Sequence, residues 1–447
     1  MPAESDASLA KFSQILTEEL RKCSKCGSCA SVCPVYAEKL SEAYCSRGKM
    51  LLARDVVRHG GETTARLAEI FNNCLVCLAC RENCPGGVRM DKVVLAARAL
   101  LAEKGMQPKA KRLVFEKMLA APATMRPAMK LGSMVQSLLF QKIPESSGLR
   151  RRFPFPALAE DQPVPDVASV PFRQRVPEYI AAPAGSRKGD VIYFVGCAAN
   201  YLFPTIGEAV VHVLHRLGYG VIIPSRQGCC GTPVEVGGET DILRELMRAN
   251  LEALGGGSEP IVTACGSGGL MLTHGYPDTA QGEERRKAES IAARTCDISV
   301  FLVKQCGMPS VLEALTRRCV TQVTYHESCH LGRGLGVHSQ PRELLHAIAP
   351  NYVEMKQADR CCGSGGTYGL THWEVARGIL ARKIANIRGS GAAVVATGCP
   401  ACLLQVEGGL GNAHMAGNAL HTIELLAWCM GYEPASARER TRFMRLR

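Results

Sequence analysis

Cysteine spacing is the feature of this sequence that most directly indicates chemistry. The chain has 447 residues and 22 cysteines, and the pattern Cys-x2-Cys-x2-Cys-x3-Cys-Pro occurs twice near its N-terminus. Thiolates at this spacing are typical ligands of iron–sulfur clusters. Four thiolates also suit zinc, but zinc ribbons use two C-x2-C pairs rather than three cysteines in one run. The motifs therefore predict a protein that moves electrons.

The two N-terminal motifs predict a pair of [4Fe–4S] clusters with crossed ligation. In such pairs, three cysteines of one run bind one cluster, and the fourth cysteine of that run binds the other cluster. The expected ligands are Cys23, Cys26, Cys29 and Cys84 for the first cluster and Cys74, Cys77, Cys80 and Cys33 for the second. Cys45 lies outside the pattern and is predicted to be a buried apolar residue.

Two Cys-Cys-Gly doublets further along the chain belong to an internal repeat that begins at Asp190. In both copies the first cysteine precedes the doublet by 32 positions, and strand and helix patterns alternate. This order predicts two small α/β units with parallel sheets and with cysteines on loops at the strand ends. The expected strands are 191–197, 221–224 and 261–265 in the first copy and 323–329, 352–355 and 393–399 in the second, with helices at 207–217 and 341–348.

The two copies differ in their cysteines. The second has five, namely Cys329, Cys361, Cys362, Cys399 and Cys402, which exceeds what an ordinary cubane needs. This surplus predicts an expanded cluster or a sulfur kept beside a cluster for thiol chemistry. The first copy has only Cys197, Cys229, Cys230 and Cys265, because Gly268 stands where a further cysteine would be. A four-thiolate cluster, zinc and an empty vestigial site are the alternatives there.

Two histidines and two glycine-rich runs lie next to these cysteines. His326 and His330 flank Cys329 and either donate hydrogen bonds to cluster sulfurs or are ordinary polar residues at a strand end. The runs 266–269 and 363–366 lack the lysine and spacing of a phosphate-binding loop. We expect them to let backbone N–H groups approach the sulfurs.

The whole chain is predicted to be an α+β multidomain protein. A helical twin-cluster domain (1–103), with helices at 46–59 and 64–71, precedes a basic amphipathic helical segment (104–150) that breaks near Pro122 and Pro127. An extended, poorly packed Pro-rich linker (151–189) follows. The Cys-Cys-Gly domains span 190–315 and 316–447.

Charge and hydropathy limit the cellular context. The net charge is +12, and residues 104–152 contain 11 Lys and Arg against two acids. The sequence has no nucleic-acid-binding motif, so this segment predicts either a docking surface for a membrane or acidic partner, or a solvated helix face. The N-terminus is not a secretory signal, and no run of about 18 apolar residues occurs. We expect a cytoplasmic protein whose membrane contact, if any, is peripheral and on the inner face.

The order of these motifs resembles that of the glycolate oxidase iron–sulfur subunit family, of a corresponding chain of anaerobic glycerol-3-phosphate dehydrogenase and of heterodisulfide-reductase-type subunits. The most specific segments are 326–333, 341–345, 361–366 and 399–402. The resemblance implies that an FAD-containing partner subunit oxidises a 2-hydroxy acid, glycolate or lactate. This chain would then pass the electrons to a quinone or another carrier.

Two other hypotheses stay open. In the heterodisulfide-reductase relatives a noncubane cluster cleaves disulfides, which would make Cys361 and Cys362 catalytic in this chain. Alternatively, the Cys-Cys-Gly units are zinc-stabilised scaffolds without redox chemistry.

Overall fold

A computed structural model of the chain describes residues 3–120, 122–142, 148–151, 159, 161–415 and 417–446. The chain forms two compact units, and neither is continuous in sequence. The first contains residues 1–121, 231–245 and 363–379, and the second contains 122–230, 246–362 and 380–447. Each predicted domain, in contrast, is one continuous segment. Long-range packing is the reason for the difference, because the segments that follow the two doublets pack within the first unit.

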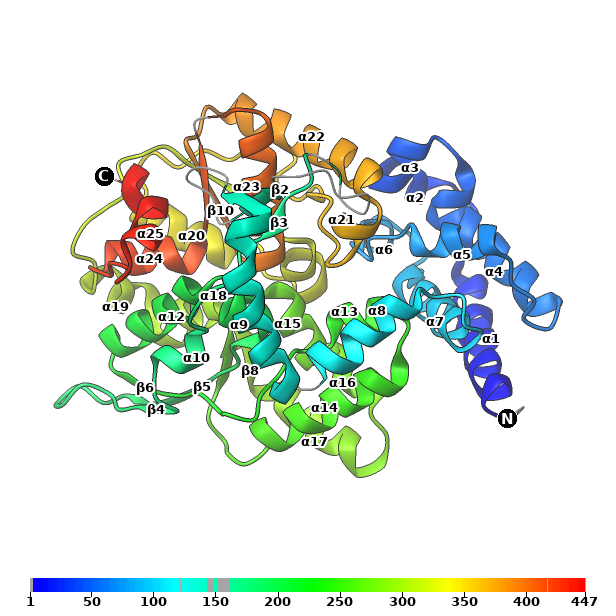
Figure 1. Ribbon diagram of the computed structural model, residues 1–447, viewed down its shortest axis with the longest axis horizontal. Helices are drawn as coiled ribbons and strands as arrows, with labels where there is room; N and C mark the ends of the chain where they lie inside the picture. The colour runs from blue at the N-terminus through cyan, green and yellow to red at the C-terminus, as the bar shows by residue number, and fades with distance from the viewer. Residues whose placement is uncertain are drawn as a thin grey trace. The chain divides into compact units, whose positions relative to one another are not determined.

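The first unit is built from helices, and its described residues include no strand. Its helical elements are α1 (Ala3–Lys22), α2 (Ser28–Val32), α3 (Pro34–Lys39), η1 (Glu42–Tyr44), α4 (Ser46–Arg58), α5 (Ala65–Asn72), α6 (Ala79–Glu82), α7 (Met90–Glu103), α8 (Lys109–Val114), the π-helix η2 (Phe115–Leu119), α13 (Thr232–Gly237) and α21 (Tyr368–Thr371). Helices α1, α4, α5 and α7 enclose a core that includes Phe12, Met50, Phe71 and Val93 (Figure 1). The predicted helical character of this region is confirmed.

Local sequence explains two of these helices. Met50, Ala53 and Val56 form the buried face of α4, which ends at His59 before two glycines with positive φ. Thr64 begins α5, and its hydroxyl accepts a hydrogen bond from the backbone N–H of Leu67 at 3.2 Å. Both predicted helices are confirmed within one or two residues.

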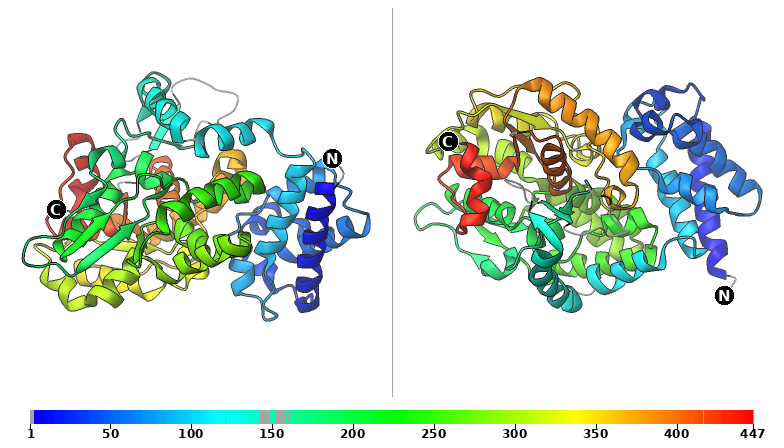
Figure 2. Two further views of the ribbon diagram at one scale, coloured as in Figure 1. Left: turned by 90° about the horizontal axis from the view of Figure 1, so that it is seen from below. Right: turned by 45° about the horizontal axis from the view of Figure 1, so that its top comes forward.

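The second unit contains three sheets (Figure 2). The largest has the order β4-β6-β5-β7-β8 and is parallel except for its edge strand β4, whereas β11-β10-β9 is fully parallel and β1-β2-β3 is antiparallel. The strands are β1 (Phe140–Lys142), β2 (Gly148–Arg151), β3 (Val164–Pro165), β4 (Tyr179–Ile180), β5 (Gly189–Tyr193), β6 (Tyr219–Ile222), β7 (Ile261–Thr263), β8 (Thr295–Asp297), β9 (Val323–His326), β10 (Val394–Thr397) and β11 (Asn418–His421).

Helices connect and cover these strands. They are α9 (Pro122–Leu139), α10 (Phe172–Arg175), α11 (Gly196–Tyr201), α12 (Pro204–Arg216), α15 (Gly266–Leu270), η3 (Met271–Gly275), α16 (Tyr276–Thr279), α17 (Gly282–Arg294), α18 (Ile298–Val300), η4 (Phe301–Gly307), α19 (Met308–Glu313), η5 (His330–Gly334), α20 (Ser339–Ile348), α23 (Pro400–Asn412), α24 (Thr422–Cys429), α25 (Ala437–Arg440) and η6 (Thr441–Leu446). Two long helices, α14 (Thr240–Leu254) and α22 (Trp373–Ser390), each include a point where the chain passes from the first unit to the second.

The predicted repeat is present, with one error. Strands β5 and β9, helices α12 and α20, and strands β7 and β10 occupy corresponding places in the two copies. The strand predicted at 352–355 is wrong, because only Tyr352 pairs, through an isolated parallel bridge to Val323. The next residue, Val353, donates its N–H to the carbonyl of Val323, and no longer ladder forms among the described residues there.

One prediction for residues 104–189 is also wrong, and another holds only in part. Helix α9 begins at Pro122, as expected for a proline in a first turn, but it continues through Pro127. A proline this near the helix start removes only one intrahelical hydrogen bond. The linker is anchored where Gln162 and Phe172 are buried, with the Phe172 ring against Gly207 of α12, whereas most of its other described residues are exposed or half-buried. Linker residues 152–158 and 160 lie outside the described part of the chain.

Candidate metal centres

Four cysteines of the first unit line one cavity. They are Cys33, Cys74, Cys77 and Cys80, and the segment around η1 and α6 completes the wall. Burial raises the pKa of Cys33 to about 12, with further contributions from the Cys77 and Cys74 thiolates. The same neighbours and burial raise the pKa of Cys80 well above its usual range. The structure therefore brings the predicted distant ligand, Cys33, to the three-cysteine run that begins at Cys74.

The loops that bear the other N-terminal cysteines are joined by a hydrogen bond. The side-chain amide of Asn83, next to Cys84, donates to the carbonyl oxygen of Ser28 at 2.8 Å. Ser28 lies between Cys26 and Cys29. This contact places the fourth cysteine of the second run beside the loop of the first run, as crossed ligation requires.

Cys45 is fully buried, which confirms the prediction for this residue. Its contact with a predicted ligand was not foreseen. The Cys45 thiol shares a hydrogen bond with Cys29, and this bond together with burial raises the pKa of Cys29.

Two buried cations near the second set of cysteines escaped the sequence analysis. The Arg98 guanidinium is 1 % exposed and donates to the backbone carbonyls of Phe71 and Cys74, at 2.9 and 2.6 Å. Lys49 is 2 % exposed, and the thiolates of Cys74 and Cys33 partly offset the lowering of its pKa by burial. Buried charges are costly without partners, so these residues match a site that carries negative charge. In the sequence both appear only as ordinary basic residues of helices.

In the first repeat, the doublet is held by a tyrosine and an asparagine. The Tyr276 hydroxyl donates to the carbonyl of Cys230 at 2.9 Å, and the Asn250 amide donates to the carbonyl of Cys229 at 2.9 Å. Thiol hydrogen bonds to Cys197 and Cys230 raise the pKa of Cys229. The fourth cysteine of this repeat, Cys265, lies between strand β7 and helix α15. The N–H of Gly268 points at its sulfur at 3.4 Å. This last bond is of the kind expected from the glycine-rich run.

In the second repeat, three predicted cysteines form a chain of thiol contacts. Hydrogen bonds to Cys362 and Cys399 raise the pKa of Cys402. Cys399 precedes helix α23 and Cys402 lies in its first turn, whereas the doublet of Cys361 and Cys362 lies on the loop before α21. The fifth cysteine, Cys329, lies immediately before η5. The ends of β9 and β10 therefore converge on one region, as parallel strands with corresponding loops require.

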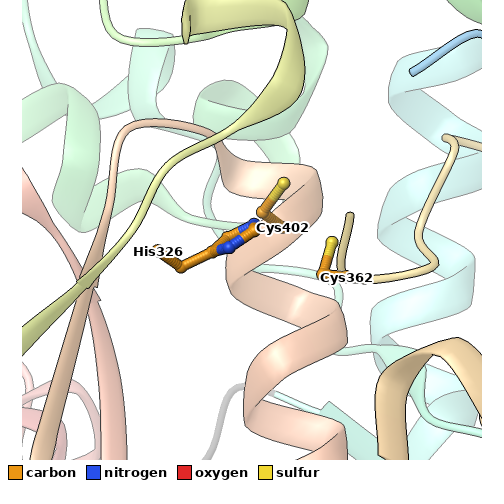
Figure 3. Close-up of side chains that lie close together, drawn as sticks. All are labelled: His326, Cys362 and Cys402. Carbon is orange, nitrogen blue, oxygen red and sulfur yellow. The ribbon is translucent and has the colours of Figure 1, made fainter. Parts of the chain in front are cut away.

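His326 reaches the same place from the end of β9. Its ring nitrogen and the sulfurs of Cys362 and Cys402 all lie within 4.8 Å of one another (Figure 3). Burial lowers the pKa of His326 to about 3, so the ring is neutral. Its Nδ1 lies 3.2 Å from the carbonyl oxygen of Ala358, which can only accept, so Nδ1 carries the proton and Nε2 has a lone pair. In this tautomer Nε2 accepts instead of donating, so the structure does not supply the hydrogen bond to a cluster sulfur that the sequence suggested for His326.

His330 has a different partner. Its Nδ1 lies 2.9 Å from the hydroxyl of Ser267, which belongs to the first repeat, and that hydroxyl lies 4.0 Å from the Cys399 sulfur. The thiols of Cys265 and Cys399 are also hydrogen-bonded, which raises the pKa of Cys265 and lowers that of Cys399. The cysteine sites of the two repeats are therefore in contact, whereas the sequence predicts two separate sites.

The donor sets suit soft metals and iron–sulfur clusters. Thiolates select Zn, Cu(I) and Fe–S centres, and within the part of the chain that the structure describes the buried Nε2 of His326 has no hydrogen-bond partner. The residues present therefore fit the clusters that the cysteine motifs predict. None of the helices that the structure describes is long and apolar enough to cross a membrane.

Comparison with known families agrees with this division of the sites. Residues 19–88 match the 4Fe-4S dicluster domain, and residues 191–273 and 323–407 each match the cysteine-rich domain that is named for its Cys-Cys-Gly motif. The expected iron–sulfur domain and the expected duplication are both confirmed.

Individual proteins are similar over most of the chain. The probable glycolate oxidase iron–sulfur subunit of Bacillus subtilis is 29% identical over 93% of this chain and 95% of its own length. A fumarate reductase (CoM/CoB) chain of Methanothermobacter marburgensis is 28% identical over 88% of this chain and 69% of its own. Lactate utilization protein A 2 of Bacillus cereus is 29% identical over 53% of this chain and 97% of its own length. The chain is thus an iron–sulfur protein of the electron-transfer type, similar throughout its length to glycolate oxidase iron–sulfur subunits.

Proposed function

We propose that this chain carries electrons from an FAD-containing subunit that oxidises a 2-hydroxy acid, glycolate or lactate, to a quinone or another carrier. The observation that supports it most is the gathering of Cys33 with Cys74, Cys77 and Cys80 around one cavity, as a twin-cluster relay requires. Similarity to glycolate oxidase iron–sulfur subunits and to a lactate utilization protein supports the substrate class. Bound clusters would supply one-electron transfer.

Under this proposal, the residues have distinct tasks. Cys23, Cys26, Cys29 and Cys84 hold the first [4Fe–4S] cluster, and Cys74, Cys77, Cys80 and Cys33 hold the second. Cys329, Cys361, Cys362, Cys399 and Cys402 hold a further iron–sulfur centre, and Cys197, Cys229, Cys230 and Cys265 hold a cluster or zinc. Arg98 and Lys49 stabilise the negative charge of the second cluster's thiolates and exclude water from them.

Reduction by substrate tests the proposal. The chain is purified without oxygen together with the FAD-containing subunit of its complex, and glycolate or lactate is added. We expect the visible absorption of the oxidised clusters to bleach and an EPR signal of reduced clusters to appear. Bleaching of the flavin alone, with oxidised clusters unchanged, would overturn the proposal.

A second candidate function is thiol–disulfide reduction at Cys361 and Cys362. It is favoured by the continuous contacts of Cys362, Cys402 and Cys399, and by similarity to a chain of fumarate reductase (CoM/CoB). The purified chain, supplied with a disulfide and a low-potential donor but no flavoprotein, would turn over if this function is correct. Metal analysis separates both functions from a zinc scaffold, which would contain zinc in place of iron in both repeats.

The proposal also includes a cytoplasmic location with peripheral contact on the inner membrane face. Helix α9 supports this idea, since Leu131 is 62% and Met134 66% exposed beside the exposed Lys130. Elsewhere on the helix, a polar contact attaches it to the linker. The side-chain amide of Gln136 donates to the carbonyl of Val167 and accepts from its N–H, both at 3.0 Å. An apolar stripe with a basic neighbour is typical of helices that lie in a membrane interface.

A further inference from the structure

His326 at the second-repeat site has a buried ring nitrogen with no hydrogen-bond partner among the described residues. The side chain is 1 % exposed, and its Nε2 is the unsatisfied atom. The sulfurs of Cys362 and Cys402 are the neighbouring donor atoms (Figure 3). A buried polar atom without a partner destabilises the fold, so its persistence calls for an explanation.

The ring orientation is fixed from the far side. The carbonyl oxygen of Ala358 faces Nδ1 at 3.2 Å, and the same oxygen accepts a hydrogen bond from the ammonium of Lys383 at 3.1 Å. Lys383 also donates to the carbonyl of Gln357 at 2.7 Å, which holds this turn in place. The other tautomer would set the Nδ1 lone pair against a carbonyl lone pair. Nε2 is therefore an electron-pair donor directed at the cysteines.

We propose that His326 Nε2 is a ligand of the iron–sulfur centre of the second repeat, beside Cys362 and Cys402. The inference rests on the proposed function only in taking this centre to be iron–sulfur. Thiols lose their protons when they bind metal, so Nε2 could no longer accept a hydrogen bond from them. Coordination to metal satisfies it. Metal-ligating histidines commonly donate their other N–H to a backbone carbonyl, as His326 does to Ala358.

The distances are compatible with this role. The three donor atoms lie within 4.8 Å of one another, so all of them can face one metal centre. A neutral imidazole in place of a thiolate also makes the centre less negative. This change raises the reduction potential, as histidine ligands do in Rieske centres.

Pulsed EPR of the full chain, labelled with 15N-histidine and loaded with clusters without oxygen, tests the inference. We expect a nitrogen coupling of directly bound strength in the wild type, its loss in His326→Gln and its retention in His330→Gln. His330 is the matched control, because it lies four residues away on Ser267. In His326→Cys, a thiolate replaces the imidazole, so we expect retained iron and a lower reduction potential. This variant keeps the test decisive if His326→Gln does not fold.

Three results would overturn the inference: no such coupling in the wild type, an unchanged coupling in His326→Gln, or zinc instead of iron at this centre. The readout is independent of substrate. Clusters that glycolate or lactate reduces without any nitrogen coupling would contradict the ligand and leave the proposed function intact. Nitrogen coupling in a protein that neither hydroxy acid reduces would contradict the proposed function and leave the ligand assignment intact.

Discussion

The backbone N–H of Gly266 donates to the carbonyl oxygen of Gly398 at 3.4 Å, and this bond joins the two repeats at equivalent loops. Gly266 follows Cys265, and Gly398 precedes Cys399. The thiols of Cys265, which follows strand β7, and Cys399, which follows β10, are thereby brought into contact. We therefore expect a change at one repeat to affect the other.

This contact predicts an asymmetric response to substitution within the first repeat. Cys265→Ser should alter the EPR spectrum of the second-repeat centre, because Cys265 lies against Cys399. Cys197→Ser is the control, since its thiol partner is Cys229 of its own repeat. Identical second-repeat spectra in wild type and Cys265→Ser would contradict the prediction.

Crossed ligation predicts which cluster each substitution removes. Cys33→Ser should abolish the same EPR signal as Cys74→Ser, with a loss of about four irons per chain, because Cys33 lies with the run that starts at Cys74. Cys84→Ser should abolish the other signal. Iron analysis and EPR of the three dithionite-reduced variants provide the measurement. Loss of the Cys74-type signal in Cys84→Ser, with that signal retained in Cys33→Ser, would show uncrossed ligation.

The hydrogen bonds of Arg98 predict that the stability of the second ferredoxin cluster depends on a residue that is not one of its ligands. Arg98→Met leaves several buried carbonyls, including that of Cys74, without their donor, at a cost of about 2–4 kcal/mol. We expect faster loss of the second ferredoxin cluster in the presence of a chelator, followed by visible absorption. Arg98→Lys should recover part of the stability. Equal rates in wild type and Arg98→Met would exclude this role.

Helix α9 predicts membrane or partner association through one face. Replacing Lys130 with Glu and Leu131 and Met134 with Gln should reduce binding to anionic liposomes at least tenfold in a sedimentation assay. Arg286→Glu on α17 makes the same charge change on another exposed helix of the same unit. Arg112 is a poor test position, because it is ion-paired with Asp241 at 2.6 Å. Liposome binding that is equal in the triple variant and in Arg286→Glu would count against a docking face.

Asp297 predicts a pH-dependent stability. Its carboxylate accepts a hydrogen bond from the N–H of Ser299 at 2.9 Å, and burial raises its pKa from 3.8 to about 6. The folded state therefore binds more protons than the unfolded state between about pH 4 and 6, and stability from this group is lost as pH rises through that window. Asp297→Asn stays neutral and keeps the acceptor.

The Asn variant should therefore gain stability relative to wild type, by up to about 3 kcal/mol, between pH 4 and 7. Thermal unfolding midpoints recorded without oxygen across this range measure the difference. Parallel pH profiles for the two proteins would contradict the prediction.

Elements with local causes could be predicted from the sequence. Near neighbours in the chain determine the apolar face of Met50 and Val56 and the capping hydroxyl of Thr64. They also determine the alternation of strand and helix patterns around β5 and β10. The cysteine runs are equally local, so the sequence alone predicted the iron–sulfur domain and the duplication that the family comparison confirms.

Features that depend on distant contacts could not be predicted. The ring tautomer of His326 is set by Ala358, 32 residues later, and the burial of Arg98 is completed by its hydrogen bond to Val236. The contact between Cys265 and Cys399 depends on how the two repeats pack. Tyr352 has the β-propensity of a strand residue, but a single bridge is all that its surroundings allow.

The discontinuity of the two compact units limits how this protein can be divided. The chain passes from one unit to the other five times, and two of these passages come directly after Cys230 and Cys362. A gene fragment that ends at residue 103 therefore encodes an N-terminal unit without α13 and α21. An N-terminal segment moved to another protein without these two helices would therefore lack part of its own compact unit.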